Sequence, residues 1–257
     1  MPEKHAQTRN RLLDAFPARA LARIKSHLEL VRLSPSDVLF DTGEQLKYVY
    51  FPTTGIVSLV NVMANNRITE LVSVGNEGML GTSTFMGDGI TTARAVVQGE
   101  GHGHRLEQDQ LLKEVHRERP VLRLLLRYIQ VLTVQMVQAA AYNRHHLIEQ
   151  RLCRVLLESL DRFPTNKFVT THDQIATKLG VRREGITEAA GRLRNAELIQ
   201  VHRGAITILD RLGLEKAGCE CNDEVKLAFG RLFADASRFI RSARDATPKS
   251  NRASTMP

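Results

Sequence analysis

Apolar residues along the chain repeat with two different periods, and each period predicts a different kind of element. Over residues 9–30 they recur at helical spacing on both sides of Pro17, which predicts two short helices. From about Val38 the spacing falls to two, which predicts strands separated by glycine and asparagine turns. The predicted strands cover residues 38–40, 48–51, 56–60, 68–72 and 95–97. Several short strands at near-regular intervals favour a small β-barrel or a β-sandwich.

The helical period returns at Pro120 and continues to about Tyr142. One apolar stripe has the alternating three and four spacing of a coiled-coil seam and consists of Leu122, Leu125, Ile129, Leu132, Met136 and Ala139. A second stripe beside it consists of Val121, Leu124, Tyr128 and Val131. A helix that is apolar on two sides can pack against its own domain and against a second copy of the chain. The alternative is a single helix buried inside a monomer.

A helix-turn-helix is predicted between residues 171 and 198. Thr171 and Gln174 have the spacing of a capping box, so a helix should begin there. Gly180 stands where the chain must turn, and a second helix with an apolar inner face starts near Arg183. In this motif the first helix supports the second in the major groove of DNA. An ordinary helical hairpin with solvated basic faces would show a similar pattern.

The segments around this motif make it more specific. Residues 143–162 predict a preceding helix, and residues 198–201 and 205–209 predict two strands around a tight turn, which is a β-wing. Residues 222–246 predict an additional helix, and residues 247–257 have the composition of a disordered tail. That additional helix could block DNA, extend a dimer interface or cover the wing, and the sequence does not distinguish these roles.

Composition indicates the kind of partner and the cellular compartment to expect. The 257 residues carry a formal net charge of +8, which suits a polyanionic partner such as nucleic acid. No apolar run is close to the roughly 20 residues needed to span a bilayer. The N-terminal segment lacks the uninterrupted apolar core of a signal peptide. We therefore expect a cytoplasmic protein with no membrane association.

Candidate metal and catalytic chemistry is sparse. Cys153, Cys219 and Cys221 form neither a complete set of pairs nor a zinc box, which favours reduced thiols; a redox role of Cys219 and Cys221 stays open. His102 and His104 would share one face of a strand, with no third ligand in reach. We expect no metal, no cofactor and no enzymatic activity.

A glycine-rich segment, residues 75–87, separates two of the predicted strands. Its backbone N–H groups could bind a phosphate. Alternatively, the glycines serve only the geometry of a turn.

The order of these parts resembles the Crp/Fnr family of bacterial transcription regulators, over residues 10 to 220. The most specific segments are 51–59, 75–81 and the helix-turn-helix. The resemblance implies an α+β protein with an N-terminal double-stranded β-helix (a cyclic-nucleotide-binding-like barrel), a long dimerisation helix and a C-terminal winged helix-turn-helix. The corresponding boundaries are 1–119 for the sensor domain, 120–142 for the dimerisation helix, 143–221 for the DNA-binding domain, 222–246 for the added helix and 247–257 for the tail.

The resemblance also implies partners and DNA-reading residues. It implies a homodimer on a two-fold operator of double-stranded DNA, with RNA polymerase as a further partner. The implied DNA-binding residues are Thr171, His172, Arg182, Arg183, Glu184, Thr187, Glu188 and Arg203.

Arg183 is the candidate for a bidentate contact to guanine, and Glu184 for accepting from a cytosine amino group. Arg182, His172 and Arg203 are candidates for phosphate contacts. Glu188 replaces an arginine of the family pattern, so a different operator sequence is expected.

The sensor half departs from the cyclic-nucleotide binders of this family. Those members carry Gly-Glu, where this chain has Gly81-Thr82, and an Arg-Ser or Arg-Thr pair, where this chain has Thr91-Thr92. We therefore expect weak or no binding of cyclic AMP or cyclic GMP.

Candidate residues for an unknown small-molecule effector are Gly81, Thr82, Ser83, Thr92 and Arg94. The alternative function is a small-ligand sensing module whose helix-turn-helix is structural or protein-binding.

Overall fold

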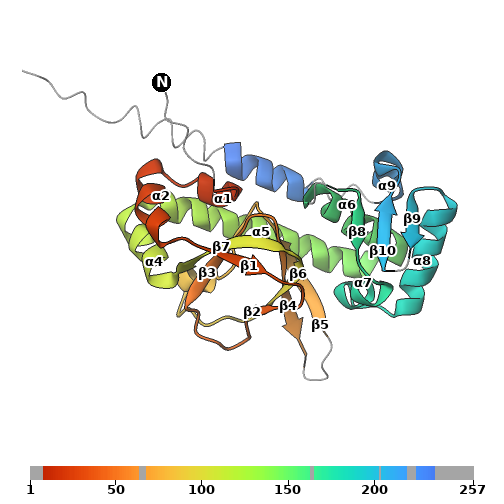
Figure 1. The fold of residues 1–257 in the computed structure, drawn as a ribbon, viewed down its shortest axis with the longest axis horizontal. Coiled ribbons are helices and arrows are strands. Elements are labelled where there is room, and N and C mark those ends of the chain that lie inside the picture. The colour runs from red at the N-terminus through yellow and green to blue at the C-terminus, as the bar shows by residue number, and fades with distance from the viewer. Residues whose placement is uncertain (1–7, 64–67, 163–164, 203, 219–223, 235–257) are drawn as a thin grey trace, which may run out of the picture.

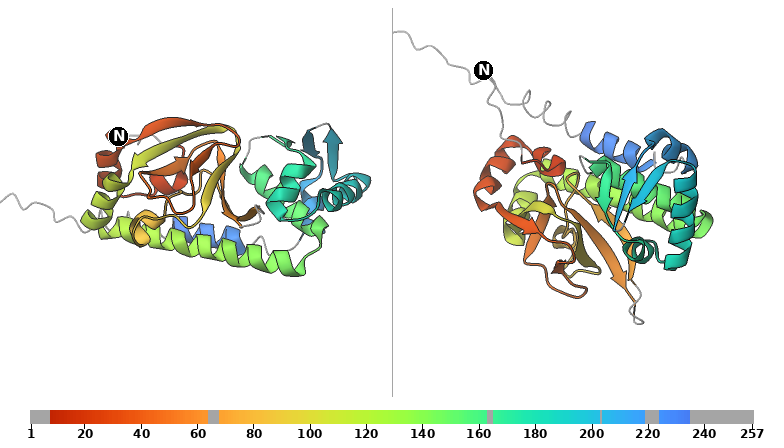
Figure 2. Two further views of the ribbon diagram at one scale, coloured as in Figure 1. Left: turned by 90° about the horizontal axis from the view of Figure 1, so that it is seen from below. Right: turned by 45° about the vertical axis from the view of Figure 1, so that its right-hand side comes forward.

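The computed structural model describes residues 8–63, 68–162, 165–202, 204–218 and 224–234 (Figure 1). The N-terminal barrel lies along one long helix, and the C-terminal helical domain lies at the far end of that helix, as Figure 2 also shows. The order of parts agrees with the α+β architecture predicted from the sequence.

The barrel is built from two antiparallel sheets. The first has the order β1 (Glu29–Leu33), β7 (Gly101–Glu107), β3 (Tyr48–Pro52). The second has the order β2 (Val38–Phe40), β6 (Arg94–Gly99), β4 (Ile56–Val62), β5 (Ile68–Val74). All five predicted strands are present, each with the predicted bounds or slightly longer ones.

Two further strands of the barrel were not predicted from the pattern. Strand β1 begins at Glu29, so its first two residues overlap the stretch predicted to be helical. Two residues are too few for the apolar spacing to distinguish a helix from a strand. Strand β7 carries glycines and charged residues instead of alternating apolar ones. Gly101 of that strand approaches the backbone of Gly55 so closely that no Cβ would fit. Backbone proximity therefore shaped this strand's sequence more than hydrophobic alternation did.

Short helices close the barrel at its ends. They are α1 (Arg11–Asp14), α2 (Ala18–Ile24), the 3₁₀ turn η1 (Lys25–His27), α3 (Ser83–Met86) and α4 (Gln108–Arg117). Asn10, fully buried, caps α1 by accepting from the N–H of Leu13 at 2.9 Å. Its amide also donates to the carbonyls of Pro52 and Gly78, both at 2.8 Å. One side chain thus joins α1, β3 and the glycine-rich segment.

Helix α5 (Arg119–His145) lies along the barrel and contributes to its core. Its buried residues are Val121, Leu124, Leu125, Tyr128, Val131 and Leu132. Two members of the predicted seam, Leu125 and Leu132, therefore pack inside one chain and are not available to a partner. The segment Arg119–Ala141 is long and apolar enough to cross a membrane by composition, with a mean hydropathy of 1.3, which the sequence pattern did not lead us to expect. Because its inner face completes the barrel core, it is a core helix.

The C-terminal domain has its own core. Its elements are α6 (Ile148–Arg162), β8 (Lys167–Val169), α7 (His172–Leu179), α8 (Arg183–Asn195), β9 (Ile199–His202), β10 (Ala205–Ile208) and α9 (Arg211–Ala217). The two wing strands pair as predicted, and β8 adds a third strand to the far side of β10. The preceding helix starts at Ile148, five residues later than predicted, because the chain breaks its helical conformation at residues 146–147.

A further helix covers residues 224–234. Its apolar side chains join the core of the N-terminal domain, with Leu232 only 1% exposed. The described part of this helix therefore packs on the N-terminal domain, a contact that was not considered from the sequence. Residues 235–257, Cys219, Cys221 and Arg203 lie outside the described part of the chain.

Candidate nucleic-acid interface

The start of the helix-turn-helix is fixed by a reciprocal cap. The hydroxyl of Thr171 accepts from the N–H of Gln174 at 3.2 Å, and the side chain of Gln174 accepts from the N–H of Thr171 at 2.8 Å. At the other end of α7, Gly180 adopts φ +64°, which is the left-handed conformation that glycine tolerates best. The two ends of α7 therefore follow directly from the sequence.

Small residues let α8 pack closely onto the rest of the domain. Ile186, Ala189, Ala190 and Leu193 are at most 1% exposed, and they meet Ala176 of α7 in the same core. The opposite face of the two helices is turned to solvent. The predicted reading residues Thr171, Arg182, Arg183, Glu184, Thr187 and Glu188 are exposed or half-buried, and His172 is half-buried. The fold brings these seven residues to one surface.

Contacts within this surface orient its side chains. His172 Nδ1 lies 3.0 Å from Thr187 Oγ1, and that hydroxyl donates to the carbonyl of Arg183 at 3.1 Å. Arg183 Nε lies 3.6 Å from Asp173 Oδ2. Burial, followed by the charge of Arg183, lowers the pKa of His172, so its ring is neutral at pH 7.

Asp173 was not singled out from the sequence. An acidic residue in the first turn of a helix is common for reasons of the helix dipole alone, so no local pattern pairs it with Arg183.

Gly185 has a packing role that the sequence left open. A Cβ on this residue would lie 2.8 Å from Cδ1 of Ile148, the first residue of α6. The glycine thus allows α8 to approach the junction between α5 and α6. This contact is with the end of a flexible side chain, and it adds a packing reason for glycine at this position.

Charged residues hold α8 and α7 on α6. Arg192 pairs with Glu149 at 2.5 Å. Arg151, which is 7% exposed, donates to the carbonyl of Leu179 at the end of α7. Burial and the nearby Arg154 lower the pKa of Arg151. These contacts fix the angle between the reading helices and α6.

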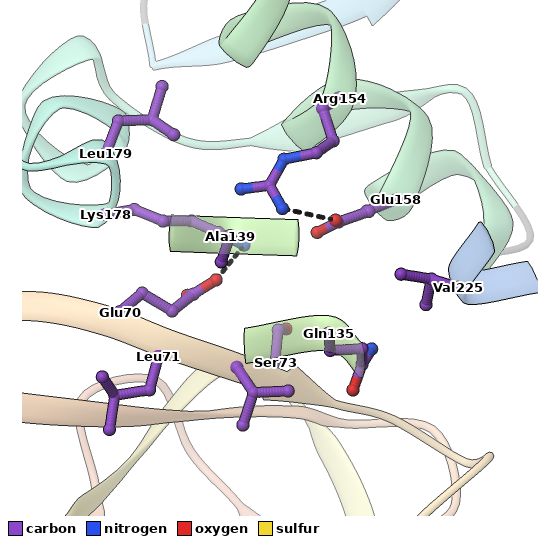
Figure 3. Close-up of a pocket in the computed structure, with 11 residues that line it drawn as sticks. Glu70, Leu71, Ser73, Gln135, Ala139, Arg154, Glu158, Lys178, Leu179 and Val225 are labelled. Atoms are coloured by element: carbon purple, nitrogen blue, oxygen red, sulfur yellow. Dashed lines mark ion pairs between the residues drawn. The ribbon is translucent and has the colours of Figure 1, made fainter. Parts of the chain in front are cut away.

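The helix-turn-helix also contacts the barrel. Lys178 of α7 pairs with Glu70 of β5 at 3.3 Å, and Ser58 of β4 donates to Glu70 at 2.5 Å. Figure 3 shows this pair facing a second one, Arg154 with Glu158 at 3.4 Å, across a cavity of about 30 Å³. A cavity of this size holds about one water molecule. The contact therefore joins the two domains.

The glycine-rich segment of the barrel meets Tyr128 of α5. The N–H of Met79 donates to Tyr128 Oη at 3.0 Å, and the hydroxyl donates to the carbonyl of Met79 at 2.9 Å. A Cβ on Gly78 would lie 2.7 Å from Cζ of the same ring. Glycine is therefore needed here so that tyrosine can approach the backbone.

The structure places the candidate effector residues in different surroundings. Gly81 is buried with φ +93°, and Thr82 and Ser83 form the start of α3. Thr92 is exposed on a loop. Arg94 makes a two-point contact with Asp41, at 2.9 Å and 2.7 Å. The arginine of this set is therefore already paired.

His102 and His104 lie on β7 opposite Arg32 and Leu30 of β1. Within the described residues, no group of three or more His, Cys, Asp or Glu side chains is placed to hold a metal ion.

Comparisons with known proteins agree with this architecture. The family described as a Crp-like helix-turn-helix domain matches residues 150–217, and the family described as a cyclic nucleotide-binding domain matches residues 30–118. No curated protein matches the chain.

Several solved structures share the fold. FixK2 from Bradyrhizobium japonicum is 15% identical, with a TM-score of 0.66 over 75% of this chain and 98% of that one. The c-di-GMP responsive global regulator CLP from Xanthomonas campestris is 16% identical, with a TM-score of 0.60 over 75% and 99%. A CRP-family transcriptional regulator from Thermus thermophilus, TTHB099, is 21% identical, with a TM-score of 0.60 over 73% and 95%. With both domains matched in order and the helix-turn-helix fully formed, the chain belongs to the Crp/Fnr family of DNA-binding transcription regulators.

Proposed function

We propose that the chain acts as a homodimer that reads a two-fold symmetric operator, and that its barrel does not bind cyclic AMP or cyclic GMP. The observation that carries the DNA-reading part is the exposed face of α8, which stands on a fully packed helix-turn-helix. The same function puts the protein in the cytoplasm, with the DNA. RNA polymerase is the partner that activation of transcription would require.

Arg183 is the central base reader in this proposal. Its Nε faces Asp173 at 3.6 Å, which leaves the two terminal nitrogens of the guanidinium for O6 and N7 of a guanine. Glu184 accepts from the amino group of a cytosine, and Glu188 one turn later reads a further base. Thr171, His172, Thr187 and Arg182 contact phosphates or base edges around them, and Arg203 contributes from the wing.

The homodimer rests on the outer face of α5. A mostly apolar stripe with four and three spacing runs along this face, exposed or half-buried, and consists of Leu122, Leu126, Ile129, Thr133, Met136 and Ala140, with Val137 beside it. Leu126 is 51% exposed and Val137 is 60% exposed. Apolar residues in a heptad pattern on an exposed helix face favour a coiled coil with a second copy. This stripe lies beside the seam predicted from the sequence and retains Leu122, Ile129 and Met136.

Two contacts within the N-terminal domain support the proposal that it does not bind cyclic AMP or cyclic GMP. Tyr128 takes the backbone groups of Met79, and Asp41 takes the guanidinium of Arg94. Among the candidate effector residues Arg94 is the arginine, and because it is already paired a cyclic phosphate would gain no free guanidinium there. CLP, a solved structure with this fold, is described as responsive to c-di-GMP.

The test is selection of bound duplexes from a randomised pool by the purified full chain at fixed salt. We expect a two-fold symmetric motif without any added ligand. Arg183→Ala should lower affinity for that motif by about 1–3 kcal/mol and relax one position of it. Arg182→Ala is the matched control, because a lost phosphate contact weakens binding to all duplexes. It should also reduce the slope of log K against log salt concentration by about one.

Calorimetry with cyclic AMP separates this function from the alternative. Tight binding of the nucleotide, together with no enriched duplex, would instead identify a ligand-sensing module whose helix-turn-helix is structural or protein-binding. Enrichment only in the presence of cyclic AMP would contradict the proposal for the barrel.

A further inference from the structure

The helix over residues 224–234 follows the DNA-binding domain in sequence, but its apolar side chains belong to the other domain. Leu232 is 1% exposed within the core formed by the barrel and α5. Ala228, Phe229 and Phe233 pack against the same core. Figure 1 shows this helix above α5, between α1 and α6. The chain thus returns to the N-terminal domain after completing the wing.

Aromatic contacts orient the helix over residues 224–234 on the N-terminal domain. The rings of Phe229 and Phe233 are stacked, with centroids 6.2 Å apart and an interplanar angle of 12°. The guanidinium of Arg11 on α1 lies 4.3 Å from the centroid of the Phe233 ring. A cation over an aromatic face adds a directional attraction to the burial of Leu232. The contact joins the two ends of the described chain.

The same helix is attached to the DNA-binding domain through charge. Lys226 Nζ lies 3.4 Å from Asp161 Oδ2 of α6, and Arg211 of α9 lies 2.6 Å from Asp161 Oδ1. Asp161 therefore joins the helix to the side of the domain formed by α6 and α9. This side is distinct from the exposed reading face of α7 and α8, so the helix leaves the described reading residues free.

We propose that helix 224–234 is an intramolecular brace that fixes the DNA-binding domain relative to the barrel. The helical conformation is broken between α5 and α6, at residues 146–147, and the domain could rotate about this link if only the Lys178–Glu70 side of the interface opposed it. Besides the Lys178–Glu70 pair, the brace adds a further connection between the domains, with its apolar part on the barrel core and its charged part on α6. Two separated attachments restrict rotation that one attachment allows.

A fixed domain angle matters for reading DNA, and this part rests on the proposed function. Two recognition helices bind a two-fold operator only at one separation, so a domain that rotates freely must lose that freedom on binding. The brace removes this freedom before DNA arrives. Operator affinity therefore depends on a helix that contributes no reading residue.

The test compares Leu232→Asp with Leu227→Asp in the full chain. Both changes add a carboxylate to the same helix, but Leu227 is 56% exposed and provides the matched control. In Leu232→Asp we expect amide exchange in α1 and at residues 146–147 to accelerate by about ten-fold or more. We expect affinity for the selected operator to fall by about five- to ten-fold, with binding to random DNA unchanged. Leu227→Asp should match the wild type in all three measurements.

Phe233→Ala is a milder second variant, in case Leu232→Asp prevents folding. It adds no charge to the core and removes the ring that lies under Arg11. It should give smaller changes in the same direction. Equal exchange rates in Leu232→Asp, Phe233→Ala and the wild type would overturn the brace. If the wild type selects no duplex, the proposed DNA-reading function fails, whereas the exchange measurements still decide whether the brace exists.

Discussion

The hydroxyl of Tyr128 is hydrogen-bonded to both backbone groups of Met79, at 3.0 Å to the nitrogen and 2.9 Å to the oxygen. Tyr128 belongs to the long helix α5, and Met79 belongs to the glycine-rich segment of the barrel. Neither residue is exposed. This pair therefore ties the helix that carries the proposed dimer seam to the interior of the sensor domain.

Replacing Tyr128 with Phe should destabilise the protein by about 1–3 kcal/mol. The ring still fills its space, but the N–H and carbonyl of Met79 lose their partner in a buried position. Urea unfolding followed by circular dichroism measures the change. A Phe variant as stable as the wild type would mean that water replaces the hydroxyl.

Two glycines of α8 should respond differently to replacement with alanine. Gly191→Ala should stabilise the helix by up to about 1 kcal/mol, because no atom lies within 4 Å of the added Cβ. Gly185→Ala should gain less or lose stability, since its Cβ would meet Ile148.

Ile148→Val removes the Cδ1 atom in question. In the Gly185→Ala, Ile148→Val double variant, part of the stability lost through the contact between the new Cβ and Ile148 should be recovered. A double-mutant cycle on unfolding free energies detects this recovery. Strict additivity would show that the Ile148 side chain simply rotates away.

Leu126→Asp should convert the proposed homodimer to a monomer without unfolding it. The residue is exposed in the single chain, so only an interface between copies would bury the new charge. Sedimentation analysis gives the molecular mass, and Gln138→Asp on a neighbouring face of α5 serves as the control. A Leu126→Asp chain that remains dimeric would place the interface elsewhere.

Cys153 should make stability depend on pH in the alkaline range. Burial, together with the nearby Glu149, raises the pKa of this thiol to about 12. Above the ordinary thiol pKa the unfolded chain releases a proton that the folded chain keeps, so the unfolding free energy falls as pH rises. The loss approaches about 1.4 kcal/mol per pH unit between roughly pH 9 and 12.

Urea unfolding at several pH values measures this slope, and Cys153→Ala should show a shallower one. Equal slopes would assign the alkaline loss of stability to other groups. At neutral pH, thiol reagents should reach Cys153 only after unfolding.

The helix-turn-helix could be predicted in detail because each of its rules is local. Thr171 and Gln174 lie three residues apart, and Gly180 marks its own turn, so neighbours in sequence determine the geometry. The inner face of α8 was also predicted correctly, since helical periodicity alone separates Ile186 from Thr187.

Features that depend on distant contacts could not be predicted in the same way. Leu125 and Leu132 were predicted to face a second copy but lie in the barrel core, because two adjacent apolar stripes of α5 have nearly the same spacing and only contact with the barrel separates them. The need for glycine at position 78 depends on Tyr128, and the contact that a Cβ at position 185 would make depends on Ile148; both partners are far away in sequence. The docking of Leu232 on the N-terminal core left no local pattern.

Under the proposed function, a barrel in which Tyr128 occupies the backbone groups of Met79 has a consequence for how such a regulator would receive information. In a dimer that needs no effector, the input is the amount of protein the cell makes. Below the dissociation constant of the dimer, the concentration of the DNA-reading form rises with the square of the chain concentration. Synthesis and degradation of the chain would then act as the switch, and occupancy of the operator would follow them more steeply than in proportion.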